Sequence, residues 1–166
     1  RGGLDKDTPE VATEVDGAVL AGLLIKLASV PAGFTPNPKL QKMLLEARKD
    51  MAAGKRPLDW GSAENLAYAS LVVQGYPVRL TGQDVGRGTF THRHAIFHDV
   101  NDATRYSPLN TIQPDVADFA IHDSSLSEMG VLGFEYGNST TDPRALTIWE
   151  AQFGDFVNGA QVVVDQ

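Results

Sequence analysis

One glutamate, Glu128, stands at the head of a nearly uncharged stretch, SSLSEMGVLGFEYG. Ser127 before it is predicted to cap a helix, and a carboxylate in a first helical turn is stabilised by about 0.3–1 kcal/mol. Position alone therefore favours an electrostatic role for Glu128. The alternative is chemical, because apolar neighbours (Met129, Gly130 and Val131) would desolvate the carboxyl, raise its pKa and let it donate a proton. The residues themselves leave both interpretations open.

Three histidines, His92, His94 and His98, lie close together in the segments HRH and FHD. On a strand, His92 and His94 would share a face at a spacing that can bind a metal ion. No cysteine or clear third ligand accompanies them, so we predict no metal site. The favoured interpretation is partly exposed structural histidines, and the alternative is that His92 and His94 line the polar mouth of an active site.

The segment GQDVGRGTF has glycines at positions 82, 86 and 88 and resembles a phosphate-binding loop. It lacks the lysine of a P-loop and does not match the GxGxxG pattern. We interpret it as a turn in which the backbone approaches a neighbouring segment closely.

The segment WEAQFGDF carries polar and aromatic side chains around one glycine. One interpretation is a strand-to-helix turn in which Phe153 and Phe156 belong to the core and Asp155 caps the next helix. The alternative is a flat aromatic face that stacks on a planar ring, with Gln152 as a hydrogen-bond partner.

The N-terminal third predicts packing or linker helices. Residues 11–28 predict a helix, and the prolines of the following segment ASVPAGFTPNP end it. KLQKMLLEARKDMAAG predicts an amphipathic helix with an apolar face formed by Leu40, Met43, Leu44 and Ala47.

Strands alternate with helices through the rest of the chain. The helix SAENLAYASLVVQG, with Ser62 as cap and Gly75 as stop, precedes the strand PVRLTG. The strand DFAIHD precedes the helix that begins at Ser127, and the strand ALTIWEA precedes the helix VNGAQVVVDQ. This order predicts an α/β fold with a parallel sheet covered by helices on both faces.

Ligands of open parallel sheets bind at the carboxyl ends of the strands. Three segments follow the predicted strands and are expected to meet there, namely residues 82–94, 124–128 and 150–156. Their convergence is the first indication of a binding site.

Composition excludes several classes of protein. The net charge of −7 argues against nucleic-acid binding, and the absence of cysteine excludes disulfides and thiol nucleophiles. The longest apolar run, AVLAGLLI, is too short to span a membrane. We expect a soluble, intracellular-type domain, and the abrupt ends of its 166 residues suggest a piece of a longer protein.

Three long segments carry a resemblance to a known family. LDWGSAENLAYASLVVQGYPVRLTGQDVGRGTFTHRHA, LSEMGVLGFEYG and LTIWEAQFGDFVNGAQVVVDQ resemble the thiamine-diphosphate-dependent first component of the 2-oxoglutarate dehydrogenase complex. More narrowly, they resemble its pyrimidine-binding, transketolase-like domain. The resemblance implies that residues 1–57 form a helical connector and that residues 58–166 form this domain, incomplete at its C-terminus.

The resemblance also implies roles for individual residues. Glu128 would pair with a ring nitrogen of the aminopyrimidine, which requires a protonated or proton-sharing carboxyl. Phe156 would stack on the ring with Gln152 nearby, Leu126 would line the pocket, and Gln83 would lie at its edge. Many relatives have an acid where Gln83 stands, so a proton-relay role is not expected for it.

The implied activity is decarboxylation of 2-oxoglutarate and transfer of the succinyl group to lipoamide on the succinyltransferase second component, a step of the tricarboxylic acid cycle. The family builds each site between two subunits of a homodimer. Its magnesium ligands lie in a diphosphate-binding domain with a Gly-Asp-Gly motif, which this sequence lacks. The chain alone is thus expected to be inactive, and the enzyme to be cytoplasmic in a bacterium or in the mitochondrial matrix of a eukaryote. The alternatives are a 2-oxoglutarate decarboxylase or carboligase, and a non-catalytic dimerisation domain.

Overall fold

The computed structural model describes residues 10 and 12–166. Helix α1 (Gly17–Leu27) begins after Asp16, whose carboxylate accepts hydrogen bonds from the backbone N–H groups of Ala18 and Val19. The helix predicted over residues 11–28 is therefore confirmed only from Gly17 onward. The side-chain cap at Asp16 sets its start, and residue 11 lies outside the described residues.

A continuous helical run follows, composed of α2 (Pro38–Leu40), the π-helical turn η1 (Gln41–Leu45) and α3 (Glu46–Ala52). The predicted apolar face is partly wrong, because Met43 is 65% exposed whereas Leu45 is buried. A π-helical turn inserts an extra residue and rotates the side chains that follow. The run packs on α1 through buried side chains of both helices, namely Leu23, Leu24, Leu27, Ala47 and Met51.

The predicted parallel sheet is confirmed. Strands β1 (Val78–Gly82), β4 (Phe119–Asp123) and β5 (Leu146–Glu150) lie in the order β4-β1-β5, and both neighbouring pairs are parallel. Gly82, at the end of β1, is in register with Asp123 and Glu150, so the three strands end together.

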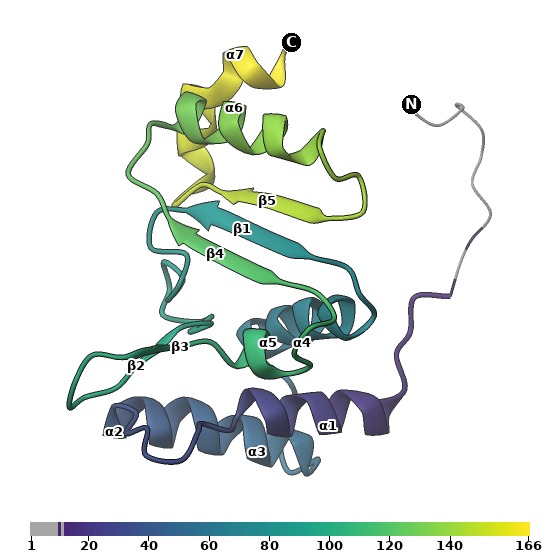
Figure 1. The fold of residues 1–166 in the computed structure, drawn as a ribbon, viewed down its shortest axis with the longest axis vertical. Coiled ribbons are helices and arrows are strands. Elements are labelled where there is room, and N and C mark those ends of the chain that lie inside the picture. The colour runs from purple at the N-terminus through teal and green to yellow at the C-terminus, as the bar shows by residue number, and fades with distance from the viewer. Residues whose placement is uncertain (1–9, 11) are drawn as a thin grey trace.

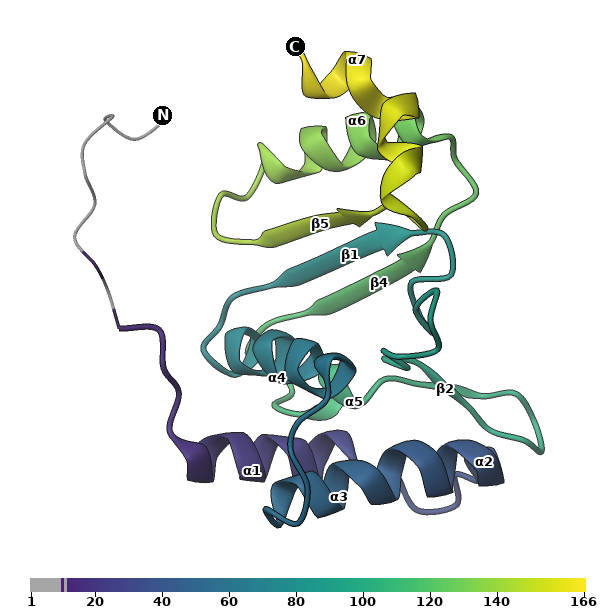
Figure 2. The same cartoon turned by 180° about the vertical axis from the view of Figure 1, so that it is seen from behind.

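Helices cover both faces of this sheet (Figures 1 and 2). Helices α4 (Trp60–Val73) and α5 (Pro108–Thr111) lie on one face, with α1 and α3 stacked beyond them. On the other face lie α6 (Glu128–Ser139), the 3₁₀ helix η2 (Gly154–Ala160) and α7 (Gln161–Val164). The apolar core fills the α4 side, through residues that include Leu66, Ala69, Val72, Val78, Leu80 and Phe119.

A short antiparallel pair, β2 (Phe97–His98) and β3 (Arg105–Tyr106), lies apart from the main sheet. The alternation of strands and helices did not predict this hairpin. Two-residue strands are too short to produce a periodic pattern of side chains.

The helix ends test the predicted caps. Ser127 caps α6 by accepting a hydrogen bond from Gly130 N, and Gly75 has a φ of +88° just past the end of α4, as predicted. The prediction for Ser62 is wrong, because Asp59 caps α4 and accepts a bond from Ser62 N at 2.8 Å. Asp155 caps no helix either, because η2 already begins at Gly154 and places Asp155 in its first turn.

Candidate functional site

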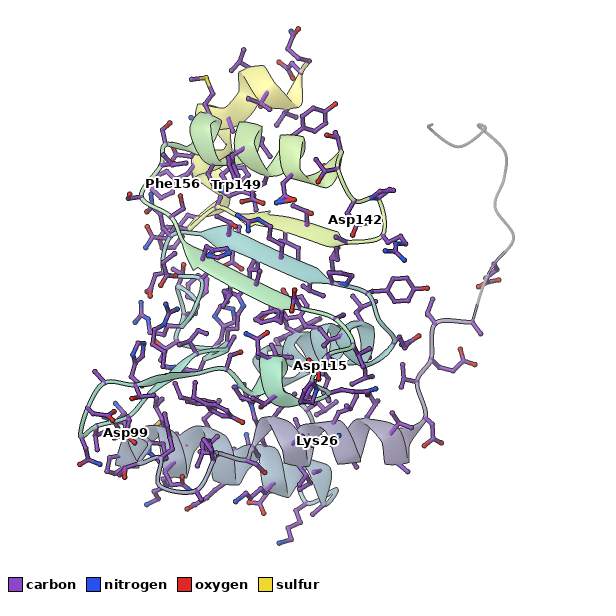
Figure 3. All side chains as sticks on the ribbon, in the orientation of Figure 1. Lys26, Asp99, Asp115, Asp142, Trp149 and Phe156 are labelled. Carbon is purple, nitrogen blue, oxygen red and sulfur yellow. The ribbon has the colours of Figure 1, made fainter. Side chains whose placement is uncertain are left out.

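The residues that follow the three strands meet in one pocket at the carboxyl edge of the sheet. It is lined by Gly82, Gln83, Ser124, Leu126, Glu128, Val131, Trp149, Glu150, Ala151, Gln152 and Phe156. All five residues to which the resemblance assigned cofactor contacts therefore line one pocket, because parallel strands deliver their following loops to the same edge. Figure 3 shows Trp149 and Phe156 at this end of the sheet, beneath α6.

Glu128 enters the pocket as the first residue of α6 and is partly buried. Its carboxylate packs against the backbone of η2, where a Cβ atom built on Gly159 would lie 3.1 Å from Oε2 of Glu128. Val131 is buried as expected for an apolar neighbour, but Met129 is 52% exposed. The expected apolar surroundings are therefore corrected: Val131 lies with Glu128 at the pocket, Met129 does not, and the backbone of Gly159 contacts the Glu128 side chain.

The aromatic side chains of WEAQFGDF do not belong to the core. Phe153 and Phe156 are 48% and 44% exposed, and their ring centroids lie 6.0 Å apart in an edge-on arrangement. Phe90 continues the row at 5.9 Å from Phe153. Exposed aromatic rings beside a polar pocket favour the ring-stacking interpretation over the core interpretation.

An ion-pair cluster of Arg93, Glu64 and Glu150 adjoins the pocket, which Glu150 lines. The guanidinium of Arg93, which is fully buried, donates to Oε2 and Oε1 of Glu64 at 2.9 Å each and to Oε1 of Glu150 at 3.0 Å. Burial by itself would lower the pKa of Arg93, but the hydrogen bonds to Glu150 and Glu64 outweigh it and raise the pKa above its ordinary value. Arg93 therefore stays charged.

His92 lies beside this cluster, with Nε2 at 3.9 Å from Oε2 of Glu64. Glu64, His92 and Glu150 offer ligand atoms within 4.8 Å of one another, a geometry that can suit a metal ion. Arg93 already binds both carboxylates and neutralises their charge, so we assign the cluster to an ion pair.

His94 lies elsewhere, and the expectation that it shares a strand face with His92 is wrong. The carbonyl oxygen of Arg87 accepts hydrogen bonds from both Arg93 N and His94 N, which folds this segment into a compact loop. His94 has a φ of +40°, is buried, and lines a separate polar pocket that also includes Asp84. Burial, with Arg48 nearby, lowers the pKa of His94.

A comparison with known families assigns the fold. Residues 56–166 match the model of the transketolase pyrimidine-binding domain. The chain belongs to this family.

This transketolase pyrimidine-binding domain chain has close relatives among curated proteins. It is 53% identical to the 2-oxoglutarate dehydrogenase E1 component of Azotobacter vinelandii over 154 aligned residues. The aligned region covers 93% of this chain and 16% of the relative. It is 52% identical over 165 residues to that of Cupriavidus necator (97% and 17%) and 50% identical over 159 residues to that of Rickettsia conorii (96% and 17%). The chain thus spans about a sixth of the length of these relatives.

The pocket has a volume of only about 10 Å³, but the kinds of side chain around it suit an aminopyrimidine ring. A carboxyl group (Glu128), two amides (Gln83 and Gln152), an exposed aromatic face (Phe156) and an apolar wall (Leu126) are the groups that a polar, planar heterocycle requires. Among the residues that the structure describes, no helix combines the length and apolar character needed to cross a membrane.

Three residues at the candidate site were not predicted from the sequence. Trp149 lines the pocket from the end of β5, Gly159 contacts Glu128, and Arg93 holds Glu150. Arg93 lies between two histidines that drew attention, but no local pattern marks an arginine as buried.

Proposed function

We propose that this chain is part of a 2-oxoglutarate dehydrogenase E1 component and supplies the pyrimidine-binding half of its thiamine diphosphate site. The single observation that carries the proposal is the convergence of Glu128, Phe156, Gln152, Gln83 and Leu126 on one pocket. The relatives that share about half of its residues bear that enzyme's name. Residues 1–57 would be the helical connector and residues 58–166 the pyrimidine-binding domain.

When bound, thiamine diphosphate supplies an electron sink for decarboxylation of a 2-oxoacid. Glu128 would face a nitrogen of the pyrimidine ring, and its carboxylate is placed there by its position as the first residue of α6 and by its contact with the backbone of Gly159. Phe156 would stack on the ring, Gln152 and Gln83 would offer amide hydrogen bonds, and Leu126 would exclude water.

The magnesium ligands and the second component lie outside this chain. Magnesium would be held by the diphosphate-binding domain of a second subunit in a homodimer, and the succinyl group would pass to the lipoyl-bearing succinyltransferase. His92, partly exposed and 6.2 Å from the ring of Phe90, is our candidate for the active-site mouth. His94 lines a different pocket, so we place it outside the mouth. We propose the bacterial cytoplasm as the compartment, since the relatives named above are bacterial.

The test uses the full-length enzyme. Glu128→Ala should reduce decarboxylation of 2-oxoglutarate at least about tenfold, equivalent to about 1.4 kcal/mol of transition-state stabilisation. A smaller loss would contradict the role of Glu128.

Calorimetric titration with thiamine diphosphate and magnesium should show binding by the wild type, and failure to bind would favour a non-catalytic dimerisation domain. Release of the semialdehyde without succinyl transfer to lipoamide would indicate a decarboxylase instead.

A further inference from the structure

Arg93 joins two segments that both contribute residues to the cofactor pocket. Besides the contacts to Glu64, its Nη1 donates to the carbonyl oxygen of Val85 at 2.9 Å and to Oε1 of Glu150 at 3.0 Å. Its Nη2 also binds Oε2 of Glu150. One guanidinium therefore holds both the loop after β1 and the end of β5.

Each of these anchor points is two residues from a pocket amide. Val85 follows Gln83 by two positions, and Glu150 precedes Gln152 by two. Gly82 and Glu150 are register partners where β1 and β5 separate, and a Cβ atom on Gly82 would overlap the carbonyl oxygen of Glu150. Beyond this point no ladder hydrogen bond of the sheet joins the two loops, so their separation depends on side chains such as Arg93.

The backbone of Arg93 is itself held by side chains of α3 and α4. Its carbonyl oxygen accepts hydrogen bonds from Nη2 of Arg48 at 2.8 Å and from Nδ2 of Asn65 at 3.0 Å. Its N–H donates to the carbonyl oxygen of Arg87 at 3.1 Å. Because Arg48 lies in α3 and Asn65 in α4, the guanidinium projects from a rigid base.

We propose that Arg93 is a positioning residue for thiamine diphosphate that sets the separation of Gln83 and Gln152 and thereby the affinity for the cofactor. The proposal rests on the function proposed above. Arg93 would act through the loops it holds, since the pocket lining includes Glu150 but not Arg93. A planar fork of five donors is required, because one group must bind two carboxylates and a carbonyl at once.

Arg93→Lys in the full-length enzyme tests this geometry while it keeps the charge. We expect the dissociation constant for thiamine diphosphate, measured by calorimetry with magnesium, to rise at least about tenfold. The kcat at saturating cofactor should stay within about threefold of the wild type, because Glu128 and Phe156 are untouched. A defect in the fold alone would not produce this split between affinity and turnover.

Arg79→Lys is the matched control. Arg79 also makes a two-point pair, donating to Oε2 and Oε1 of Glu135 at 2.7 and 2.9 Å, but it lies near the start of β1 and outside the cofactor pocket. The affinity of the Arg79→Lys enzyme for thiamine diphosphate should stay within about twofold of that of the wild type. Equal effects of the two variants would overturn the proposal.

Glu150→Gln serves as the second variant, and it decides the matter if Arg93→Lys fails to fold. It keeps the size of the side chain and leaves Arg93 its pair with Glu64. Weaker cofactor binding in Glu150→Gln would support the proposal by itself. Where Arg93→Lys folds, a smaller further loss in the double variant would support it again. Unchanged cofactor affinity in either folded variant would overturn it. A wild type that binds no thiamine diphosphate would overturn the proposed function itself, and this inference with it.

Discussion

The carboxylate of Glu128 rests on the backbone of Gly159, so that a Cβ atom at position 159 would stand 3.1 Å from Oε2 and 3.4 Å from Cβ of Glu128. The first residue of α6 is thus held by a glycine of η2, a segment that begins beyond the third strand of the sheet. A methyl group at position 159 would fit only if the Glu128 side chain moved by a few tenths of an ångström.

Gly159→Ala is expected to displace the Glu128 carboxylate, because the added methyl group makes a contact tighter than ordinary van der Waals distance. In the full-length enzyme, decarboxylation should fall at least about tenfold, since small misplacements of a catalytic group are costly. Gly154→Ala is the control, because no other heavy atom of the described chain lies within 4 Å of its added Cβ. Equal activities of the two variants would contradict the prediction.

Phe156→Leu is expected to weaken cofactor binding by removing an aromatic face from the pocket. Aromatic pairs contribute about 0.5–1.5 kcal/mol beyond buried area, so the KM for thiamine diphosphate should rise about two- to twelvefold. Phe90→Leu changes an exposed ring of the same row that does not line the pocket, and its KM should not change. Steady-state kinetics with varied cofactor distinguishes the two.

Arg79→Met should destabilise the domain, because it leaves the carboxylate of Glu135, 2% exposed, without its two-point partner. Removal of one member of a buried pair costs about 3 kcal/mol or more. The melting temperature of the full-length protein should fall by several degrees, while Arg79→Met/Glu135→Leu should recover most of the loss. Failure of the double variant to recover stability would show that the pair contributes more than compensation of charge.

The same pair predicts a loss of stability in acid. Burial by itself would raise the pKa of Glu135, but the hydrogen bonds from Arg79 hold it below its ordinary value of 4.5. A carboxyl whose pKa is lowered on folding stabilises the protein above its unfolded pKa, and this contribution is lost as pH falls through the lowered value. Melting temperatures of wild type and Arg79→Met should therefore converge as pH falls below about 4.5, because protonation of Glu135 removes the charge that Arg79 compensates.

Asp59→Ala should destabilise α4 by about 1 kcal/mol, because it removes the carboxylate that accepts a hydrogen bond from Ser62 N. Ser62→Ala should be nearly neutral, since the described residues provide no hydrogen-bond partner for the buried Ser62 Oγ. Thermal denaturation of the two variants tests which residue caps the helix. A larger loss of stability in Ser62→Ala than in Asp59→Ala would show that Ser62 caps α4.

Local signals predicted the elements that position the site. The strands β1, β4 and β5 follow from short runs of apolar residues, and Ser127 marks the start of α6 by the preference of serine for a helix cap. The gathering of loops at one edge follows from the parallel order of these strands. The predicted N-cap was wrong at α4, where Asp59 and Ser62 stand three residues apart. Either side chain can cap a helix, so the residue type alone does not decide between them.

The sequence by itself thus determined the class of fold and the edge of the sheet at which the three loops gather, since these depend on patterns that neighbouring residues produce. The five side chains that meet at this edge were named by the resemblance to a known family, because no local pattern marks them. Only the tertiary structure decided what holds them. Arg93 binds Glu64 and Glu150 across separations of 29 and 57 residues, and His92 and His94 lie apart because backbone hydrogen bonds fold their loop. Such contacts depend on the packing of distant segments, whose side chains and glycines carry no local pattern that would predict their partners.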